Sequence, residues 1–206
     1  MLSLPLLAFG LTHLTDARYF AAWNARYLCF SLGTADGLSL TDFLAIREWV
    51  EGPVCVAELG ADAGAEVSPE ELAAAGVSHL LLPYGTDAAP FRQAGIEVLT
   101  RIPVAGYHSV SDVKERLSET SGTILLDVAD GGIAFTDLAE GSPFSLGELQ
   151  RVLGDREAFL HLDIDVDEVD EAAAVLPGLA LRGSSEEKVG YKSFDDLDDL
   201  LEALEA

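Results

Sequence analysis

The chain has 206 residues, of which 49% are hydrophobic and 23% charged, values that are typical of a globular protein and exclude intrinsic disorder. It carries 36 acidic residues against 12 basic ones, a formal net charge of −24. A chain so poor in cations has no basic stripe to neutralise phosphates, which argues against nucleic acid as a partner. The surplus of carboxylates, with only three lysines, is typical of proteins from salt-accumulating halophiles, because high salt screens their mutual repulsion.

The opening of the chain is apolar but does not have the pattern of a signal peptide. It lacks a basic segment, Pro5 interrupts it, and the polar residues His13 and Asp16 follow closely. No apolar run reaches the roughly 20 residues that are needed to cross a membrane. We therefore expect a cytoplasmic protein with no membrane partner, either a monomer or a homodimer.

Strand-like and helix-like segments alternate along the whole chain. The strand-like segments are short apolar runs, as expected for strands that are covered on both faces. Strands are expected at residues 4–10, 27–33, 53–59, 79–83, 97–104, 123–128, 158–164 and 179–182. Helices are expected at residues 16–23, 39–50, 68–76, 88–94, 109–119, 145–153, 167–176 and 193–204.

Several local signals refine these boundaries. Thr15 is the expected N-cap of the first helix, and Ser68 that of the third, where Pro69 and the acidic residues behind it complete a strong helix start. Pro103 could break the fifth strand. A longer loop is expected between the sixth strand and the helix at 145–153.

Eight strand–helix units in strict alternation predict parallel strands with the helices outside. A closed (β/α)8 barrel, forming one domain over residues 1–206, is the expected fold. The alternative is an open, doubly wound sheet. The count of eight, with no helical block left over, favours the barrel.

The functional face of such a barrel lies at the carboxyl ends of its strands. Asp127 and Glu58 are expected there, and either could act as an acid or a base. Arg101 and Arg182 are also expected there and could hold an anion. Two plainer interpretations stay open: Asp127 could only cap the loop that follows it, and Arg101 could form a salt bridge within the barrel mouth.

Small residues follow two of the strands and could present backbone N–H groups to a phosphate. Gly183 and Ser184 come directly after the eighth strand, and Gly131 and Gly132 lie in the loop after the sixth. An ordinary turn is the alternative at residues 183–185. The expected partner is a small-molecule ligand.

Neither a metal nor a cofactor is expected. The four histidines are scattered along the chain and have no cysteine neighbours at metal-binding spacing. Cys29 and Cys55 lie within apolar, strand-like runs, so we expect them to be buried free thiols.

Three stretches resemble the phosphoribosylanthranilate isomerase family. Residues 9–18, Phe-Gly-Leu-Thr-His-Leu-Thr-Asp-Ala-Arg, are similar to the family's opening, in which the first strand runs into Cys-Gly-Leu-Thr. Residues 178–194 are similar to the family's ending, and Leu125-Leu-Asp127 is similar to its sixth strand with the catalytic Asp. The order and spacing of these stretches agree over the whole chain.

The resemblance implies an Amadori rearrangement of a phosphoribosyl aminobenzoate in tryptophan biosynthesis. The family uses a Cys general base on strand 1 and an Asp general acid on strand 6, and each proton transfer contributes roughly 10²–10⁴-fold. By resemblance Asp127 would be the acid. Phe9 stands at the position of the Cys and cannot carry a proton, and neither Cys29 nor Cys55 lies at a position that obviously replaces it.

Three loops also depart from the family's pattern. The Ser-Pro-Arg after strand 2 is replaced by residues 34–37, Thr-Ala-Asp-Gly, and the Gly-Gly-Thr-Gly-Lys loop after strand 6 is reduced to Gly131-Gly132. The loop after strand 7 contains Asp163 and Asp165, whose carboxylates would repel a phosphate.

These departures favour a diverged paralogue that binds a small ligand, with a phosphorylated one among the candidates, and has lost or weakened the usual isomerisation. The first alternative is a working phosphoribosylanthranilate isomerase with a substitute base. The second is a non-enzymatic barrel with a structural or interaction role, whose partner surface would be an exposed apolar patch.

The net charge of −24 predicts a salt-dependent stability. Repulsion between carboxylates opposes the compact state in dilute buffer and is screened within roughly 3 Å at 1 M salt. We expect the melting temperature to rise between 50 mM and 2 M KCl, measured by circular dichroism. An unchanged melting temperature would show that the acidic surface does not govern the stability.

Overall fold

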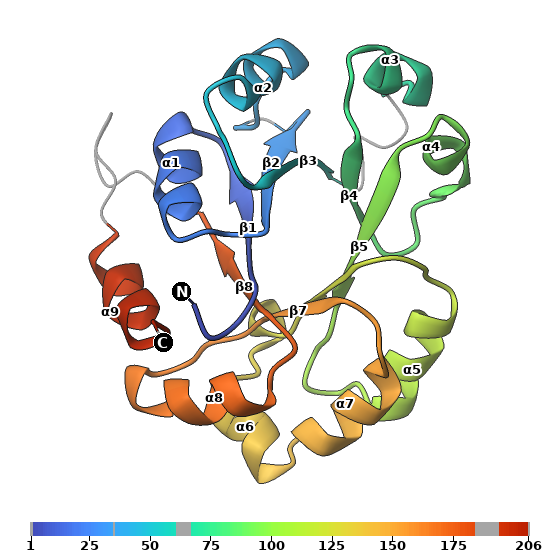
Figure 1. Ribbon diagram of the computed structural model, residues 1–206. Coiled ribbons are helices and arrows are strands. Elements are labelled where there is room, and N and C mark those ends of the chain that lie inside the picture. The colour runs from blue at the N-terminus through green and yellow to red at the C-terminus, as the bar shows by residue number, and fades with distance from the viewer. Residues whose placement is uncertain (1, 35, 61–66, 184–193, 206) are drawn as a thin grey trace.

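The structure is a computed structural model that describes residues 2–34, 36–60, 67–183 and 194–205. Its eight strands are parallel and close into a barrel in chain order, with the helices around the outside (Figure 1). Closure depends on the pairing of the first strand with the last, from Leu6 opposite Leu179 to Phe9 opposite Arg182. The expected (β/α)8 barrel is therefore confirmed, and the open sheet is excluded.

The elements follow the expected alternation. The strands are β1 (Leu6–Leu11), β2 (Tyr27–Leu32), β3 (Val54–Leu59), β4 (His79–Pro83), β5 (Glu97–Pro103), β6 (Ile124–Asp127), β7 (Ala158–His161) and β8 (Leu179–Arg182). The helices are α1 (Leu14–Ala22), α2 (Leu40–Arg47), α3 (Pro69–Ala74), α4 (Ala89–Gln93), α5 (Val110–Ser118), α6 (Phe135–Glu140), α7 (Leu146–Leu153), α8 (Val169–Val175) and α9 (Asp195–Ala203). Two 3-10 turns, η2 (Ala129–Gly131) and η3 (Val166–Glu168), precede α6 and α8.

Helix α1 begins earlier than expected. It starts at Leu14, and its N-cap is His13, whose side chain makes no capping hydrogen bond, so the prediction of Thr15 as the cap was wrong. Ser68 does cap α3, because its hydroxyl accepts a hydrogen bond from the Glu71 N–H at 3.3 Å. Strand β5 runs unbroken to Pro103.

Helix α6 occupies a stretch that was expected to be a loop. It is only six residues long, and its N-cap residue, Ala134, has no capping side chain, so the usual sequence signal is missing. The Asp137 carboxylate compensates by accepting a hydrogen bond from the Ala134 N–H at 2.9 Å. Phe135 and Leu138, three residues apart, are buried by the same turn of helix, which explains why the segment is helical.

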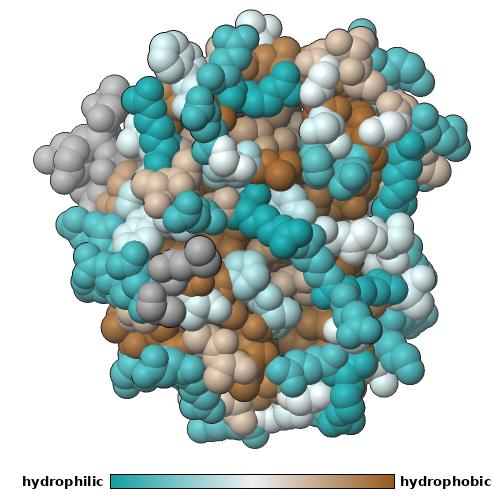
Figure 2. Space-filling view, in the orientation of Figure 1, coloured by the Kyte–Doolittle hydropathy of each residue, from teal (hydrophilic) through white to brown (hydrophobic). Residues whose placement is uncertain are grey.

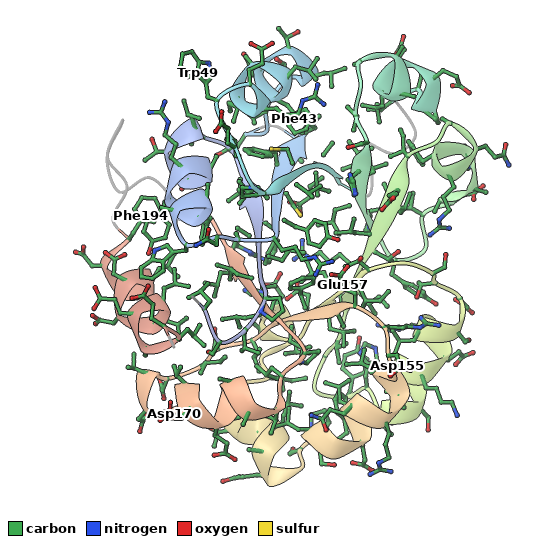
Figure 3. All side chains as sticks on the ribbon, in the orientation of Figure 1. Phe43, Trp49, Asp155, Glu157, Asp170 and Phe194 are labelled. Atoms are coloured by element: carbon green, nitrogen blue, oxygen red, sulfur yellow. The ribbon has the colours of Figure 1, made fainter. Side chains whose placement is uncertain are left out.

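Each strand contributes to two cores, because successive side chains point to opposite faces of a sheet. One set faces outward and packs against the helices, as Phe30 does against Phe43 of α2, with 5.5 Å between the ring centroids (Figure 3). The inward set fills the barrel and consists of Leu7, Phe9, Tyr27, Cys29, Val56, Leu81, Leu99, Leu125, Phe159 and Ala180. Cys29 is fully buried and free, as expected, whereas Cys55 is free but only partly buried.

The amino-terminal end of the barrel is closed by hydrogen bonds to Glu157, which immediately precedes β7 (Figure 3). Its carboxylate accepts hydrogen bonds from the hydroxyls of Tyr27, at 3.0 Å, and Thr123, at 2.6 Å. Arg26 forms an ion pair with the other carboxylate oxygen at 2.8 Å. These contacts tie the starts of β2, β6 and β7 together, which leaves the carboxyl end of the barrel for function.

The two ends of the described chain meet beside α1. The Ser3 N–H donates to the Leu204 carbonyl at 2.9 Å, and the Phe194 ring, at the start of α9, stacks on Tyr19 at 3.9 Å (Figure 3). Hydrophilic side chains are spread widely over the face that is shown in Figure 2. None of the helices in the described part of the chain is both long and apolar enough to cross a membrane.

Candidate functional site

The carboxyl end of the barrel carries a polar layer that the strand alternation places there. On six strands, the residue two positions beyond an interior apolar side chain is polar, and it therefore faces the barrel axis in the next layer. These pairs are Cys29 and Ser31, Val56 and Glu58, Leu99 and Arg101, Leu125 and Asp127, Phe159 and His161, and Ala180 and Arg182. The mouth of the barrel is thus a ring of charged and polar groups above an apolar plug.

Asp127 is the centre of this ring. Its side chain is 1% exposed, and its Oδ2 atom accepts hydrogen bonds from the Arg101 guanidinium, at 2.8 Å from Nε and at a shorter distance from Nη2. Its Oδ1 atom lies 2.7 Å from Nδ1 of His161, which stands directly opposite Asp127 in the β6–β7 pairing. Both carboxylate oxygens of Asp127 are therefore held by charged or polar partners.

These contacts decide the protonation state of Asp127. Burial disfavours the charge and acts to raise the pKa of this carboxyl group. The hydrogen bonds from His161 and Arg101, together with the positive charge of Arg101, outweigh burial and hold the pKa of Asp127 well below its usual range. Asp127 is therefore a carboxylate, without a proton to donate, at neutral pH.

Asp130 joins the two arginines of the mouth. One oxygen of its carboxylate, Oδ2, lies 2.9 Å from Nη2 of Arg101 and 2.6 Å from Nη2 of Arg182. Both guanidiniums lie over the ring of Phe9, at 5.1 Å and 5.2 Å from the ring centroid. The rings of Phe9 and His161 make an edge-to-face contact with 4.8 Å between their centroids. The buried ring of Phe9 thus forms an apolar platform beneath the charged groups.

Glu58 lies beside this network but is bound to it more loosely. Its Oε2 accepts a hydrogen bond from the Gly10 N–H at 2.8 Å and one from the Ser31 hydroxyl at 3.3 Å. Oε1 approaches Arg101 at 3.8 Å, beyond hydrogen-bond distance. Burial raises the pKa of Glu58, and the hydrogen bond from Gly10 and the charge of Arg101 offset this only in part.

The polar ring encloses an open depression of about 500 Å³. Its lining residues are Phe9, Gly10, Thr12, Ser31, Glu58, Arg101, Asp130, Arg182 and Gly183. Both polarities needed to orient a small ligand are present, since the walls carry two guanidiniums and two carboxylates.

Four of the eight expected site residues line this depression: Glu58, Arg101, Arg182 and Gly183. A fifth, Asp127, lies beneath them and is bound to Arg101. Arg101 does form the salt bridge within the barrel mouth that was the plainer interpretation of this residue, with Asp127 and Asp130 as its partners. This salt bridge does not exclude ligand binding, because the Arg101 side chain remains 27% exposed.

The three remaining expected site residues, Gly131, Gly132 and Ser184, are not among the lining residues that the structure describes. Ser184 lies outside the described residues. A side chain at Gly131 would place its Cβ 2.0 Å from the Val104 carbonyl oxygen, and Gly132 has a φ of +74°, so the close approach and the turn each account for a glycine there. Neither glycine is among the described residues that line the depression, and their binding role stays a prediction.

Two members of the network, His161 and Asp130, were not expected from the sequence. His161 ends β7 as Asp127 ends β6, and in-register pairing of the two parallel strands brings them together. The sequence reveals this pairing only when the last residue of each strand is known. Asp130 lies in η2, a turn whose conformation no sequence motif predicts.

Asp127, Asp130 and His161 bring three potential metal-ligand atoms within 4.8 Å of one another. However, Arg101 already donates to both carboxylates and Arg182 to one of them. A cation would have to enter against two guanidinium charges, so this donor set does not fit a metal ion. That no metal is needed stays a prediction.

Comparisons with known proteins identify the fold. No family model and no curated protein sequence matches the chain. Among solved structures, phosphoribosyl anthranilate isomerase from Thermus thermophilus superposes with a TM-score of 0.69 at 22% identity, over 97% of this chain and 98% of that one. The isomerase from Thermotoga maritima gives a TM-score of 0.71 at 17% identity over 98% of both chains. The enzyme from Pyrococcus furiosus gives 0.68 at 12% identity, also over 98% of both chains.

These similarities cover essentially the whole chain at low identity. The chain therefore has the barrel fold of phosphoribosylanthranilate isomerases. Identities at this level carry the fold and not the activity or the ligand.

The buried charge of Asp127 predicts a pH-dependent stability. A depressed pKa stabilises the folded state above the pKa of the unfolded chain, about 3.9, and this contribution is lost as the pH falls below that value. We expect Asp127→Asn to cost about 3 kcal/mol at pH 7, since it removes the buried member of the two carboxylates that hold Arg101 by hydrogen bonds. Urea unfolding in 2 M KCl should show this gap shrinking between pH 5 and pH 3.

The matched control is Asp163→Asn, which removes the same charge from an exposed position just after β7. It should leave the free energy of unfolding nearly unchanged at both pH values. A gap between wild type and Asp127→Asn that stays constant from pH 7 to pH 3 would show that Asp127 is not held as a carboxylate.

Proposed function

We propose that this protein binds a small molecule in the mouth of a phosphoribosylanthranilate isomerase-like barrel and that the Amadori isomerisation is lost or strongly weakened. The observation that carries the proposal is the placement of Phe9. By the resemblance it takes the position of the catalytic Cys, and it is 1% exposed, with its ring beneath the guanidiniums of Arg101 and Arg182. A phenyl ring at this position has no group that can accept a proton.

The environment of Asp127 supports the proposal as well. By the resemblance Asp127 would be the general acid. Its pKa is held well below its usual range, after the opposing effect of burial, by His161 and Arg101. A carboxylate that is stabilised in its charged form is a poor general acid near neutral pH, because the protonated fraction is small.

The mouth nevertheless keeps the features of a ligand site. The depression of about 500 Å³ lies within the range of small-molecule pockets, and Glu58, Arg101 and Arg182 converge on it. The mouth therefore binds a small molecule, with a phosphorylated one among the candidates, and its role is not purely structural.

A second candidate, a working isomerase with a substitute base, is favoured by one observation. Glu58 lines the same depression as Phe9, and burial raises the pKa of Glu58 while that of Asp127 is lowered. Two carboxyl groups whose environments shift their pKa values apart can divide the roles of acid and base. In this reading Glu58 would take the proton that the family's Cys takes.

A direct assay of phosphoribosylanthranilate isomerisation at high salt separates the two candidates. The proposal predicts turnover that is at least about 10²-fold below that of a family enzyme assayed alongside, the amount that loss of one proton-transfer group costs. Phe9→Cys is the informative gain-of-function variant, and activity in it alone would show that the rest of the site was retained.

The controls are Glu58→Gln and Asp127→Asn, each checked for folding by circular dichroism. Family-level turnover in the wild type that both variants abolish would overturn the proposal and assign Glu58 as the base. Turnover that Asp127→Asn abolishes and Glu58→Gln leaves intact would also overturn it, with the base to be found elsewhere.

A further inference from the structure

The carboxylate of Asp130 is bound in the way that a ligand anion would be. A single oxygen receives Nη2 of Arg101 at 2.9 Å and Nη2 of Arg182 at 2.6 Å. The two guanidiniums come from β5 and β8, strands that do not pair with each other in the barrel, and they converge on this one atom. Two charge-assisted hydrogen bonds to one oxygen define an oxyanion position at the mouth.

We propose that Asp130 occupies the carboxylate subsite of the barrel mouth and is displaced when a small monocarboxylate binds to Arg101 and Arg182. This inference rests on the proposed function, because it names the ligand class of the same depression. Asp130 then acts as an internal competitor that masks the two arginines in the free protein.

Asp130 can leave its position at little cost to the fold. Its side chain is 47% exposed, whereas that of Asp127 is 1% exposed. The η2 turn is held by its backbone, through hydrogen bonds from the Gly131 N–H to the Val128 carbonyl at 3.0 Å and from the Gly132 N–H to the Ala129 carbonyl at 2.8 Å. Ion pairs that are open to water contribute little to stability, so ligand and side chain can exchange.

The charges around the subsite favour a ligand with one negative charge. Once the Asp130 carboxylate has moved out, two guanidiniums remain, and Asp127 neutralises one of them. One positive charge is left when Glu58 is protonated and none when it is ionised, so a carboxylate is balanced better than a phosphate dianion. A phosphorylated ligand, which the proposed function also allows, is therefore the alternative that the test below includes.

The opposite wall of the depression specifies a second group on the ligand. Oε1 of Glu58 comes within 3.8 Å of Arg101 but makes no hydrogen bond with any described residue, while Oε2 already has two donors. Oε1 can pair with a ligand hydroxyl in either protonation state of Glu58, because a hydroxyl group both donates and accepts. The geometry therefore points to a small hydroxy acid.

The test titrates glycolate, acetate and inorganic phosphate separately into the protein and follows the Arg Nε–H and Gly10 N–H resonances by NMR. In Asp130→Asn, glycolate should bind about tenfold more tightly than in the wild type, as expected when a mask is closed about nine-tenths of the time. Arg182→Gln should abolish binding. Glycolate should bind more tightly than acetate, since only glycolate has a hydroxyl group that can pair with Glu58.

Asp163→Asn is the matched control, because it removes the same charge from an exposed position on the same face. Equal tightening in both variants would overturn the mask and leave a general charge effect. Glycolate could instead bind the wild type and Asp130→Asn equally tightly and fail to bind Arg182→Gln. This result would overturn the role of Asp130 as a mask, but the proposed binding function would stand. Preference for phosphate in Asp130→Asn would overturn the ligand class. Absence of binding in every variant would overturn both the subsite and its place in the proposed function.

Discussion

The buried charge of Asp127 is the constraint on which the rest of the mouth depends. A carboxylate with a 1% exposed side chain is tolerated only with strong partners, and Arg101 and His161 supply them from the strands on either side of β6. Holding Arg101 there brings Nη2 of its guanidinium to Asp130 as well, and Asp130 in turn holds Arg182. The ring of Phe9 completes the arrangement as an apolar surface on which both guanidiniums rest.

The same interaction that stabilises the mouth works against the chemistry that the resemblance implies. A general acid must exchange its proton near the working pH, and the partners of Asp127 keep it ionised instead. Glu58 has the opposite environment, because burial raises its pKa and Arg101 stays beyond hydrogen-bond distance. The mouth therefore combines a carboxyl group whose pKa is lowered by its partners with one whose pKa is raised by burial.

Much of the fold and part of the site could be predicted from the sequence. The apolar runs located all eight strands, and a polar residue at a strand end marked Glu58, Arg101, Asp127 and Arg182. His161 was missed because a role for it depends on the register between β6 and β7, which no local pattern contains. Helix α6 was missed because it is short and its cap, Ala134, has no capping side chain.

The most direct test of the account is a carboxyl ¹³C NMR titration of Asp127 and Glu58 in the folded protein at high salt. The account predicts that Asp127 keeps the chemical shift of a carboxylate down to the pH at which the protein unfolds, while Glu58 titrates above the unperturbed value of about 4.3. A folded protein in which Asp127 takes up a proton near or above pH 4 would contradict the account, because Arg101 and His161 would then not be holding its charge.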